Sequence, residues 1–171
     1  LAGDDTYHFA DGWGVDAIEE FPRYRVGGKR KRGGVDTLSF AGVRQGGVSA
    51  RLIPEWVGLE PAVNEAGGPG AARVGLGTSA VENLVGTRHD DEFTGGAGEN
   101  RIATGGGGED ILADYGGWND GPAGLPELRP SSDTYVTAGA NANSVQIQDF
   151  GGDADVVDLR PLRLDEVYLE A

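Results

Sequence analysis

The side chains best suited to chemistry in this sequence are carboxylates that closely follow clusters of glycine. The stretch GGAGENRIATGGGGEDILAD, residues 95–114, has glycine at seven of its first fourteen positions. Carboxylate and carbonyl oxygens are hard ligands, of which calcium takes about six to eight. The chain has 28 acidic residues against 14 Lys and Arg, and its net charge of −14 makes a compact form repel itself unless cations neutralise it. Bound cations are therefore expected.

Enzyme chemistry has little support in the residues present. The two histidines, His8 and His89, are far apart in sequence, and no H-E-x-x-H occurs. The segment GTSAV at 77–81 lacks the last glycine of a G-x-S-x-G elbow, and there is no cysteine nucleophile. Adjacent carboxylates such as Asp90 and Asp91 are more often ligands or solvated groups than catalytic acids in glycine-rich turns. We expect that the protein is not an enzyme.

Composition excludes several other classes. The acidic balance argues against nucleic acid as a partner, since such proteins carry basic faces. No apolar run approaches the length of about 18 residues that a membrane span needs. Without cysteine the chain forms no disulfide, so bound metal is the expected source of additional stability. Because Leu1 falls inside a repeat and no signal segment follows it, we expect a processed piece or a fragment of a longer protein.

A nine-residue frame recurs along the chain: Gly, Gly, any, Gly, any, Asp or Asn, any, apolar, any. Copies occur at 86–94, at 95–103, at 105–113 after the inserted Thr104, and in weaker form at 1–8, 11–19 and 33–39. The eighth-place side chain should point inward and its neighbours at places seven and nine outward. Thr104 should disturb the register. Glycines should permit positive φ and let carbonyl oxygens crowd around one point.

These repeats resemble those of the RTX family, glycine- and aspartate-rich nonapeptides of secreted bacterial proteins. The phrases DDTYHFADGWGVDAI, GGVDTLSFAGV, VENLVGTRHDDEFTGG and the closing VQIQDFGGDADVVDL strengthen the resemblance. It implies an all-β protein, a parallel β-roll or β-helix in which two nonapeptides make one coil. In this sequence we expect the coils to be interrupted, with long loops and extra flanking strands. The resemblance also implies calcium between turns two repeats apart, and non-classical type I export of an unfolded chain.

The expected calcium site with the most complete turns lies between Asp91 and Asp110, on either side of the copy at 95–103. Asn100 stands at a sixth place where the frame prefers aspartate, which removes a charge from the site. His89 stands at a fourth place where the frame has glycine, and a positive φ there would strain the histidine backbone. We therefore expect one to three bound calcium ions. The predicted metal ligands are Asp5, Gly12, Gly14, Asp16, Asp36, Asp91, Gly96, Gly98, Asn100, Gly105, Gly107 and Asp110.

Four regions are expected within one continuous domain: 1–43, degenerate repeats with a basic loop; 44–85, intervening strands and a Gly/Pro loop; 86–114, the repeat core; and 115–171, a loop and a C-terminal β cap. Alternating apolar residues predict strands over Val48–Leu52 and Val74–Leu76. Residues 115–132 contain three prolines and should form a loop or irregular cap. Val145, Ile147 and Phe150 should close the core, and helix should be sparse.

The basic run GGKRKRGG, residues 27–34, places Lys29–Arg32 between glycine pairs. The simplest interpretation is a solvated hairpin tip. Three functional interpretations stay open: a dibasic cleavage site, a dock for an acidic partner in a larger protein assembly, and head-to-tail self-association.

Two functions are predicted. The first is a calcium-binding module of a secreted or cell-surface bacterial protein, which folds on binding calcium and has a structural or secretion-related role. The alternative is an interaction or assembly subunit that docks on and stabilises a larger extracytoplasmic complex. A non-catalytic part of a secreted hydrolase is a third interpretation. All of them place the chain outside the cytoplasm, secreted, extracellular or periplasmic.

Overall fold

The structure, a computed structural model, is all-β in the part of the chain that it describes. The described residues are 3–18, 24–26, 29–31, 34–52, 65–70, 72–75, 81–96, 99–114, 117–120, 126–129, 132–137, 142–149 and 154–160. No helix occurs in these ranges, so none is found there that is long and apolar enough to cross a membrane. The prediction of an all-β fold with parallel strands is confirmed.

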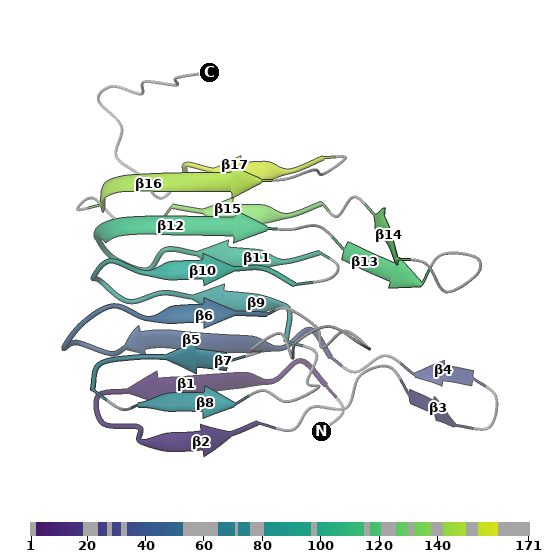
Figure 1. The fold of residues 1–171 in the computed structure, drawn as a ribbon, viewed down its shortest axis with the longest axis horizontal. Coiled ribbons are helices and arrows are strands. Elements are labelled where there is room, and N and C mark those ends of the chain that lie inside the picture. The colour runs from purple at the N-terminus through teal and green to yellow at the C-terminus, as the bar shows by residue number, and fades with distance from the viewer. Residues whose placement is uncertain are drawn as a thin grey trace.

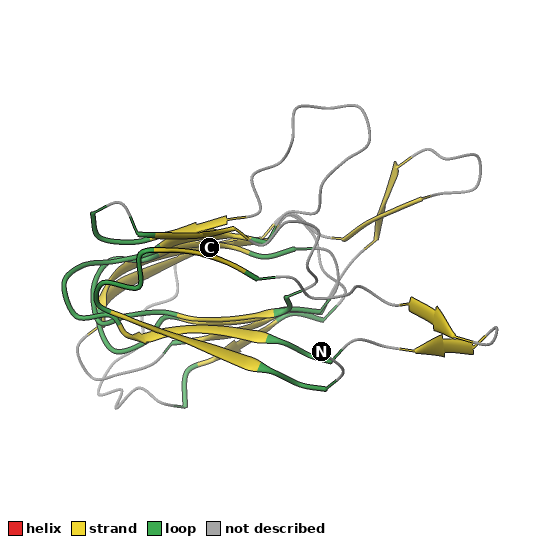
Figure 2. Ribbon diagram, turned by 90° about the horizontal axis from the view of Figure 1, so that it is seen from below, coloured by secondary structure: helices red, strands yellow, loops and turns green. Residues whose placement is uncertain are grey.

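Two sheets lie face to face, and the chain passes repeatedly from one to the other (Figures 1 and 2). The first sheet has the order β1 (Thr6–Ala10), β5 (Thr37–Gly42), β9 (Asn83–Val85), β11 (Arg101–Ala103), β15 (Thr134–Val136) and β17 (Val156–Asp158). The second has the order β16 (Ala142–Asp149), β12 (Gly108–Asp114), β10 (Glu92–Thr94), β6 (Ser49–Arg51), β7 (Glu65–Gly67), β8 (Arg73–Gly75) and β2 (Val15–Ala17). We call one strand in each sheet, with its turns, a coil.

Two nine-residue repeats make one coil between β9 and β12. Asn83 in β9 lies opposite Arg101 in β11, 18 residues later, and both strands run in the same direction. Glu92 in β10 lies opposite Ile111 in β12, 19 residues later. The prediction that Thr104 disturbs the register is therefore wrong: the pairs stay in step because the turn absorbs the extra residue. Thr104 is fully buried there, and its N–H donates to a backbone carbonyl at 3.0 Å.

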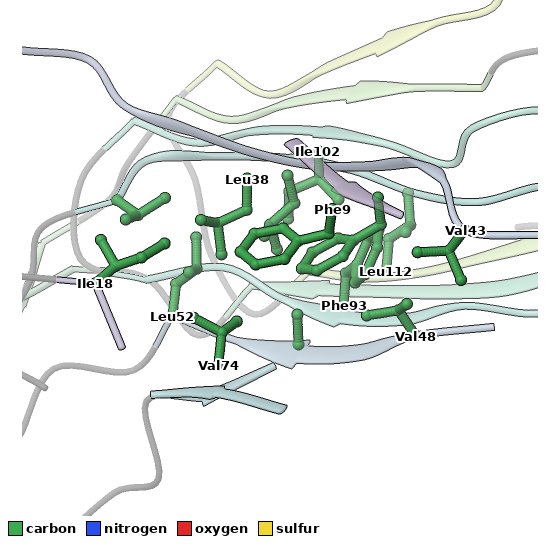
Figure 3. Close-up of a cluster of buried hydrophobic side chains, with 14 of the residues drawn as sticks. Phe9, Ile18, Leu38, Val43, Val48, Leu52, Val74, Phe93, Ile102 and Leu112 are labelled. Atoms are coloured by element: carbon green, nitrogen blue, oxygen red, sulfur yellow. The ribbon is translucent and has the colours of Figure 1, made fainter. Parts of the chain in front are cut away.

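The space between the sheets is filled by the eighth-place side chains. Leu38, Phe93, Ile102 and Leu112 have no exposed surface, as predicted, and Figure 3 shows them in one cluster. Aromatic rings in contact extend this cluster toward the first coil: Phe9 stacks on Phe40, and Trp13 packs edge-on or tilted against both. Such rings bury large apolar areas, which a thin coil otherwise lacks.

The prediction that both neighbours of the eighth place face solvent is half wrong. The seventh-place residues Glu92 and Arg101 are exposed. The ninth-place residues Thr94, Ala103 and Ala113 are only 5–6% exposed. β10 and β11 end at their ninth-place residues, and β12 ends one residue after its own. The ninth residue therefore lies where the chain leaves the strand and bends toward the opposite sheet.

The segment 44–85 contains the predicted strands in an unpredicted arrangement. Val48, Ala50 and Leu52 are buried around β6, and Val74 is buried in β8, which confirms the alternating pattern; Leu76 lies outside the described residues. However, β7 pairs antiparallel with both β6 and β8. Two reversals keep β2, β6 and the later strands of this sheet parallel to one another.

Two antiparallel hairpins stand apart from the large sheets (Figure 1). β13 (Gly117–Asp120) pairs with β14 (Pro126–Arg129), so the prediction of a loop over this segment is wrong. Pro126 is the first residue of β14, a position where a strand tolerates proline because the missing N–H is not needed for pairing. β3 (Tyr24–Val26) pairs with β4 (Lys29–Lys31), which places the basic run in a hairpin as predicted.

The C-terminal strand β16 covers the far end of the second sheet. Val145 and Ile147 are partly buried and pack against the core, as predicted. Phe150, the third residue of that prediction, lies outside the described residues.

Candidate carboxylate and calcium site

The sixth-place residues lie where a turn meets a strand, and they link neighbouring coils. At six positions of the two sheets, a backbone N–H at or aligned with this place donates to a side-chain oxygen of the next coil toward the C-terminal end; the N–H of Glu82 instead donates back to the carbonyl of Asp36 at 3.2 Å. The N···O distances are 2.9 Å from Asp5 to Asp36, 2.8 Å from Asp36 to Glu82, 2.7 Å from Asn100 to Asp133 and 2.9 Å from Asp133 to Asp155 in the first sheet, and 2.8 Å from Val48 to Asp91 and 2.9 Å from Asp91 to Asp110 in the second. We call these two rows the acidic ladders.

Paired aspartates add a bond in the reverse direction at two places. Asp90 Oδ1 accepts the N–H of Glu109 at 2.9 Å, while the N–H of Asp91 donates to Asp110 Oδ1 at 2.9 Å. The pair Asp4–Asp5 repeats this geometry with residues 35 and 36. Consecutive aspartates therefore link two coils in both directions, and each carboxylate accepts a backbone N–H at or near the start of a strand.

Asp91 has a full set of protein donors. Its Oδ1 accepts the N–H of Val48 at 2.8 Å, and its Oδ2 accepts the N–H of Thr87 at 2.7 Å. The Thr87 hydroxyl donates to the same carboxylate at 3.1 Å. Burial nevertheless raises the pKa of Asp91 to about 6, because desolvation of the charged form outweighs these hydrogen bonds.

Asp110 differs from Asp91 in that one of its oxygens lacks a partner. The residue is 1% exposed, and its Oδ2 has no hydrogen-bond partner in the described part of the chain. Burial, followed by the nearby charges of Asp91 and Asp90, raises the pKa of Asp110 to about 7. A buried anionic oxygen without a donor is costly unless a cation or a proton compensates it.

The missing donor has a local cause. In two repeats, the sixth-place side chain accepts the N–H of the residue four positions earlier: Thr87 for Asp91, and Gly96 for Asn100 at 2.6 Å. The corresponding residue before Asp110 is Gly106, but its N–H donates to the carbonyl of Thr87 at 2.7 Å. The turn at 104–107 carries the inserted residue, so its backbone turns away from the carboxylate.

Glycines let the turn before Asp110 stack closely on the turn before Asp91. Gly105 and Gly108 have φ of 86° and 104°, values that other residues adopt at a cost. A Cβ at Gly105 would overlap the Thr87 carbonyl, and one at Gly108 would overlap the carbonyl of His89. Carbonyl oxygens therefore lie against backbone that carries no side chain, as the sequence predicts.

An open groove of about 340 Å³ runs beside this site between β6, β10 and β12. Its lining is rich in carboxylates: Gly47, Val48, Ser49, Asp90, Asp91, Glu92, Glu109 and Ile111. Within the described ranges, no three acidic or histidine side chains converge to hold a metal by themselves. Calcium at this site would have to take several backbone carbonyls, which agrees with a ligand set of about six to eight oxygens.

Eleven of the twelve predicted ligands divide into three groups. Asp5, Asp36, Asp91, Asn100 and Asp110 belong to the acidic ladders. Gly96, Gly105 and Gly107 lie in the turns of the repeat core. Asp16 is exposed in the middle of β2, opposite Val74, and does not join a ladder; Gly12 and Gly14 have φ of 77° in the exposed turn before it. Gly98 lies outside the described residues.

Sequence reasoning missed ladder members that lie outside recognisable repeats. Asp133 is 1% exposed and bonds to both of its neighbours in the ladder. Its signal was the sequence Asp-Thr-Tyr at 133–135, which repeats residues 5–7. Glu82 and Asp155 had no comparable signal, since no glycine cluster of the frame places them at a sixth position.

Comparison with known proteins adds no relative to this description. No family model matches the sequence, and neither a curated protein nor a solved structure is significantly similar to it. The fold and the acidic ladders therefore define the class: an all-β protein of stacked parallel coils with buried carboxylates at the turns.

Proposed function

We propose that this chain is a calcium-binding β-roll module of the RTX type, belonging to a secreted or cell-surface protein. In this proposal it folds on binding calcium and has a structural or secretion-related role. The observation that carries the proposal is the unpartnered Oδ2 of Asp110, which is buried beside two other carboxylates. At neutral pH or above, this group needs a cation to compensate its charge.

The residues that would hold calcium belong to the stacked turns of the repeat core. Asp110 would supply a carboxylate oxygen, and the carbonyl of His89 would supply a neutral one from the coil before it. Asp91 already accepts three donors, so in this proposal it orients the turn, and it contributes negative charge to the site. Bound calcium would supply the positive charge that these carboxylates lack.

The test is calorimetric titration of calcium into three forms of the protein, with magnesium as the control ion. Asp110→Ala should weaken calcium binding at least tenfold, since it removes a charged ligand from the site. Asn100→Ala should weaken it less, because Asn100 carries no charge and its oxygen accepts the N–H of Gly96. Equal losses in the two variants, or none, would contradict the proposal.

The alternative function, an assembly subunit of a larger extracytoplasmic complex, is favoured by a different observation. An edge strand at each end of the stack carries exposed valine: Val15 is 73% exposed in β2 at one end, and Val156 is 51% exposed in β17 at the other. Isolation of the native protein with a stably bound partner, together with normal folding in chelator, would favour this alternative over the calcium module.

A further inference from the structure

Four turns that take the chain from the first sheet to the second lie along one edge of the stack. They span residues 11–14, 43–48, 86–91 and 104–107, and they follow β1, β5, β9 and β11. These four strands are parallel neighbours in the first sheet, so their turns follow one another in the same order (Figure 1). Contacts between the turns therefore determine how the proposed calcium site is held.

His89 makes contacts with the coil before it and the coil after it. Its Nε2 lies 2.8 Å from the carbonyl oxygen of Arg44 in the preceding coil. A carbonyl oxygen can only accept, so Nε2 carries the proton of this hydrogen bond. In the following coil, a Cβ at Gly108 would overlap the carbonyl of His89. One residue thus contacts both the turn between β5 and β6 and the start of β12, the strand that contains Asp110.

The turn between β5 and β6 is held from both sides. On one side, Asp11 Oδ1 accepts the N–H of Arg44 at 2.7 Å and the N–H of Gln45 at 3.2 Å. On the other side, a Cβ at Gly47 would overlap the carbonyl of Asp90, so backbone lies directly against backbone there. Any change that fixes residues 89 and 90 therefore restricts this turn as well.

A second side chain reaches the same carbonyl but makes a weaker contact. Nη2 of Arg88 lies 3.4 Å from the carbonyl oxygen of Arg44, and Arg88 is exposed. This distance is longer than that of an ordinary N–H···O hydrogen bond, whereas the contact of the His89 ring has the usual length. The link between the two turns is therefore assigned to His89.

We propose that His89 is a positioning residue for the calcium site, a role that rests on the calcium-binding function proposed above. Calcium that binds the His89 carbonyl and the Asp110 carboxylate fixes the His89 backbone, and the ring then holds the turn at Arg44. Calcium binding and the order of this turn are coupled, so each favours the other by the same factor. In the frame, His89 only departs from glycine; in the fold, its ring makes a bond that glycine could not make.

Calorimetric titration of calcium into variants of His89 is the first part of the test. His89→Phe keeps a ring but removes the donor, and it should weaken calcium binding about fivefold, the effect of one ordinary hydrogen bond. His89→Ala should behave in the same way without introducing a new ring. His89→Gln retains an N–H donor and should recover most of the affinity. The matched control is His8→Phe, since His8 is exposed in β1 and should not affect calcium binding.

Hydrogen exchange of the Arg44 and Gln45 amides is the second part of the test, in chelator and in saturating calcium, with magnesium as the control ion. In the wild-type protein, calcium should slow the exchange of these two amides by about the same factor of five, because the coupling is reciprocal. In His89→Phe and His89→Ala, calcium should leave their exchange unchanged. In His89→Gln, most of the slowing should return. A residue that only stabilised the fold would change exchange equally with and without calcium.

The possible failures are distinguishable. A wild-type protein that takes up no calcium overturns the calcium-binding function and the role of His89 with it. Calcium binding that is equally tight in the wild type, His89→Phe and His89→Ala overturns the role of His89 alone. The role is also overturned if calcium slows exchange at Arg44 and Gln45 equally with and without the ring, or if His8→Phe weakens binding as much as His89→Phe.

Discussion

Replacing Asp110 by Asn should stabilise the calcium-free protein and reduce its response to calcium. The asparagine oxygen can still accept the N–H of Asp91, which now bonds to Asp110 Oδ1 at 2.9 Å. The substitution removes the charge from the unpartnered Oδ2. At pH 8 and without calcium, the wild-type protein must fold with this carboxylate ionised, because its pKa is raised to about 7. The variant has no such requirement.

The size of the effect follows from the raised pKa of Asp110. The difference from the ordinary pKa of 3.8 corresponds to at most about 4 kcal/mol of folding free energy at pH 8. Screening by solvent in the neighbouring groove reduces this to about 2 kcal/mol. For a chain of 171 residues, that is a rise in Tm of about 4–8 °C in chelator.

Calcium should reverse the order of the two proteins. At a calcium concentration a hundredfold above the dissociation constant, each site adds about 2.7 kcal/mol to the wild-type stability. The variant lacks the charged ligand and should gain much less. Thermal unfolding at pH 8, followed by circular dichroism in chelator and in calcium, measures both differences, and magnesium serves as the control ion.

The order of the two Tm values should therefore reverse: the variant melts above the wild type in chelator, and its Tm rises by fewer degrees when calcium is added. A variant that melts below the wild type in chelator would show that Asp110 is already compensated within the protein. An equal gain from calcium in both proteins would show that calcium does not use this carboxylate.

Three further predictions concern the same turns and the basic hairpin. In chelator, Tm should fall as pH rises from about 4 to about 7. Burial raises the pKa of Asp91 to about 6 and that of Asp110 to about 7, so in this pH range the folded protein still binds protons that the unfolded chain has released. Calcium should reduce that fall, and a Tm that rises with pH in chelator would contradict the burial of these charges. Thr87→Val keeps the shape of a buried side chain but removes the hydroxyl that accepts the N–H of residue 89 and donates to Asp91. The free energy of unfolding, measured by chemical denaturation, should therefore fall by about 1–3 kcal/mol, in calcium and in chelator alike. A loss seen only in calcium would instead assign Thr87 to the metal site. Replacing Lys29–Arg32 by serine should leave Tm unchanged, because β3 and β4 form a two-stranded sheet of their own in the described part of the chain, and it should weaken any binding to an acidic partner. Unfolding of this variant would show that the hairpin is structural.

The sequence by itself determined the repeat core. Glycine clusters, sixth-place acids and eighth-place apolar residues predict short strands, and Leu38, Phe93, Ile102 and Leu112 are all fully buried. These features are local: a side chain three residues past a tight turn has little choice of face. The pairing of Asp91 with Asp110 in adjacent coils also follows from counting two repeats per coil.

Only the tertiary structure decided how the acids differ from one another. Asp91 and Asp110 hold the same place in the frame, yet the first accepts three donors and the second leaves an oxygen unpartnered. The reversal at β7 and the recruitment of Glu82 and Asp155 into a ladder likewise depend on which segments meet across the stack. The hydrogen bonds of the acidic ladders join residues 19 to 46 positions apart, and no local sequence pattern specifies which donor meets which carboxylate.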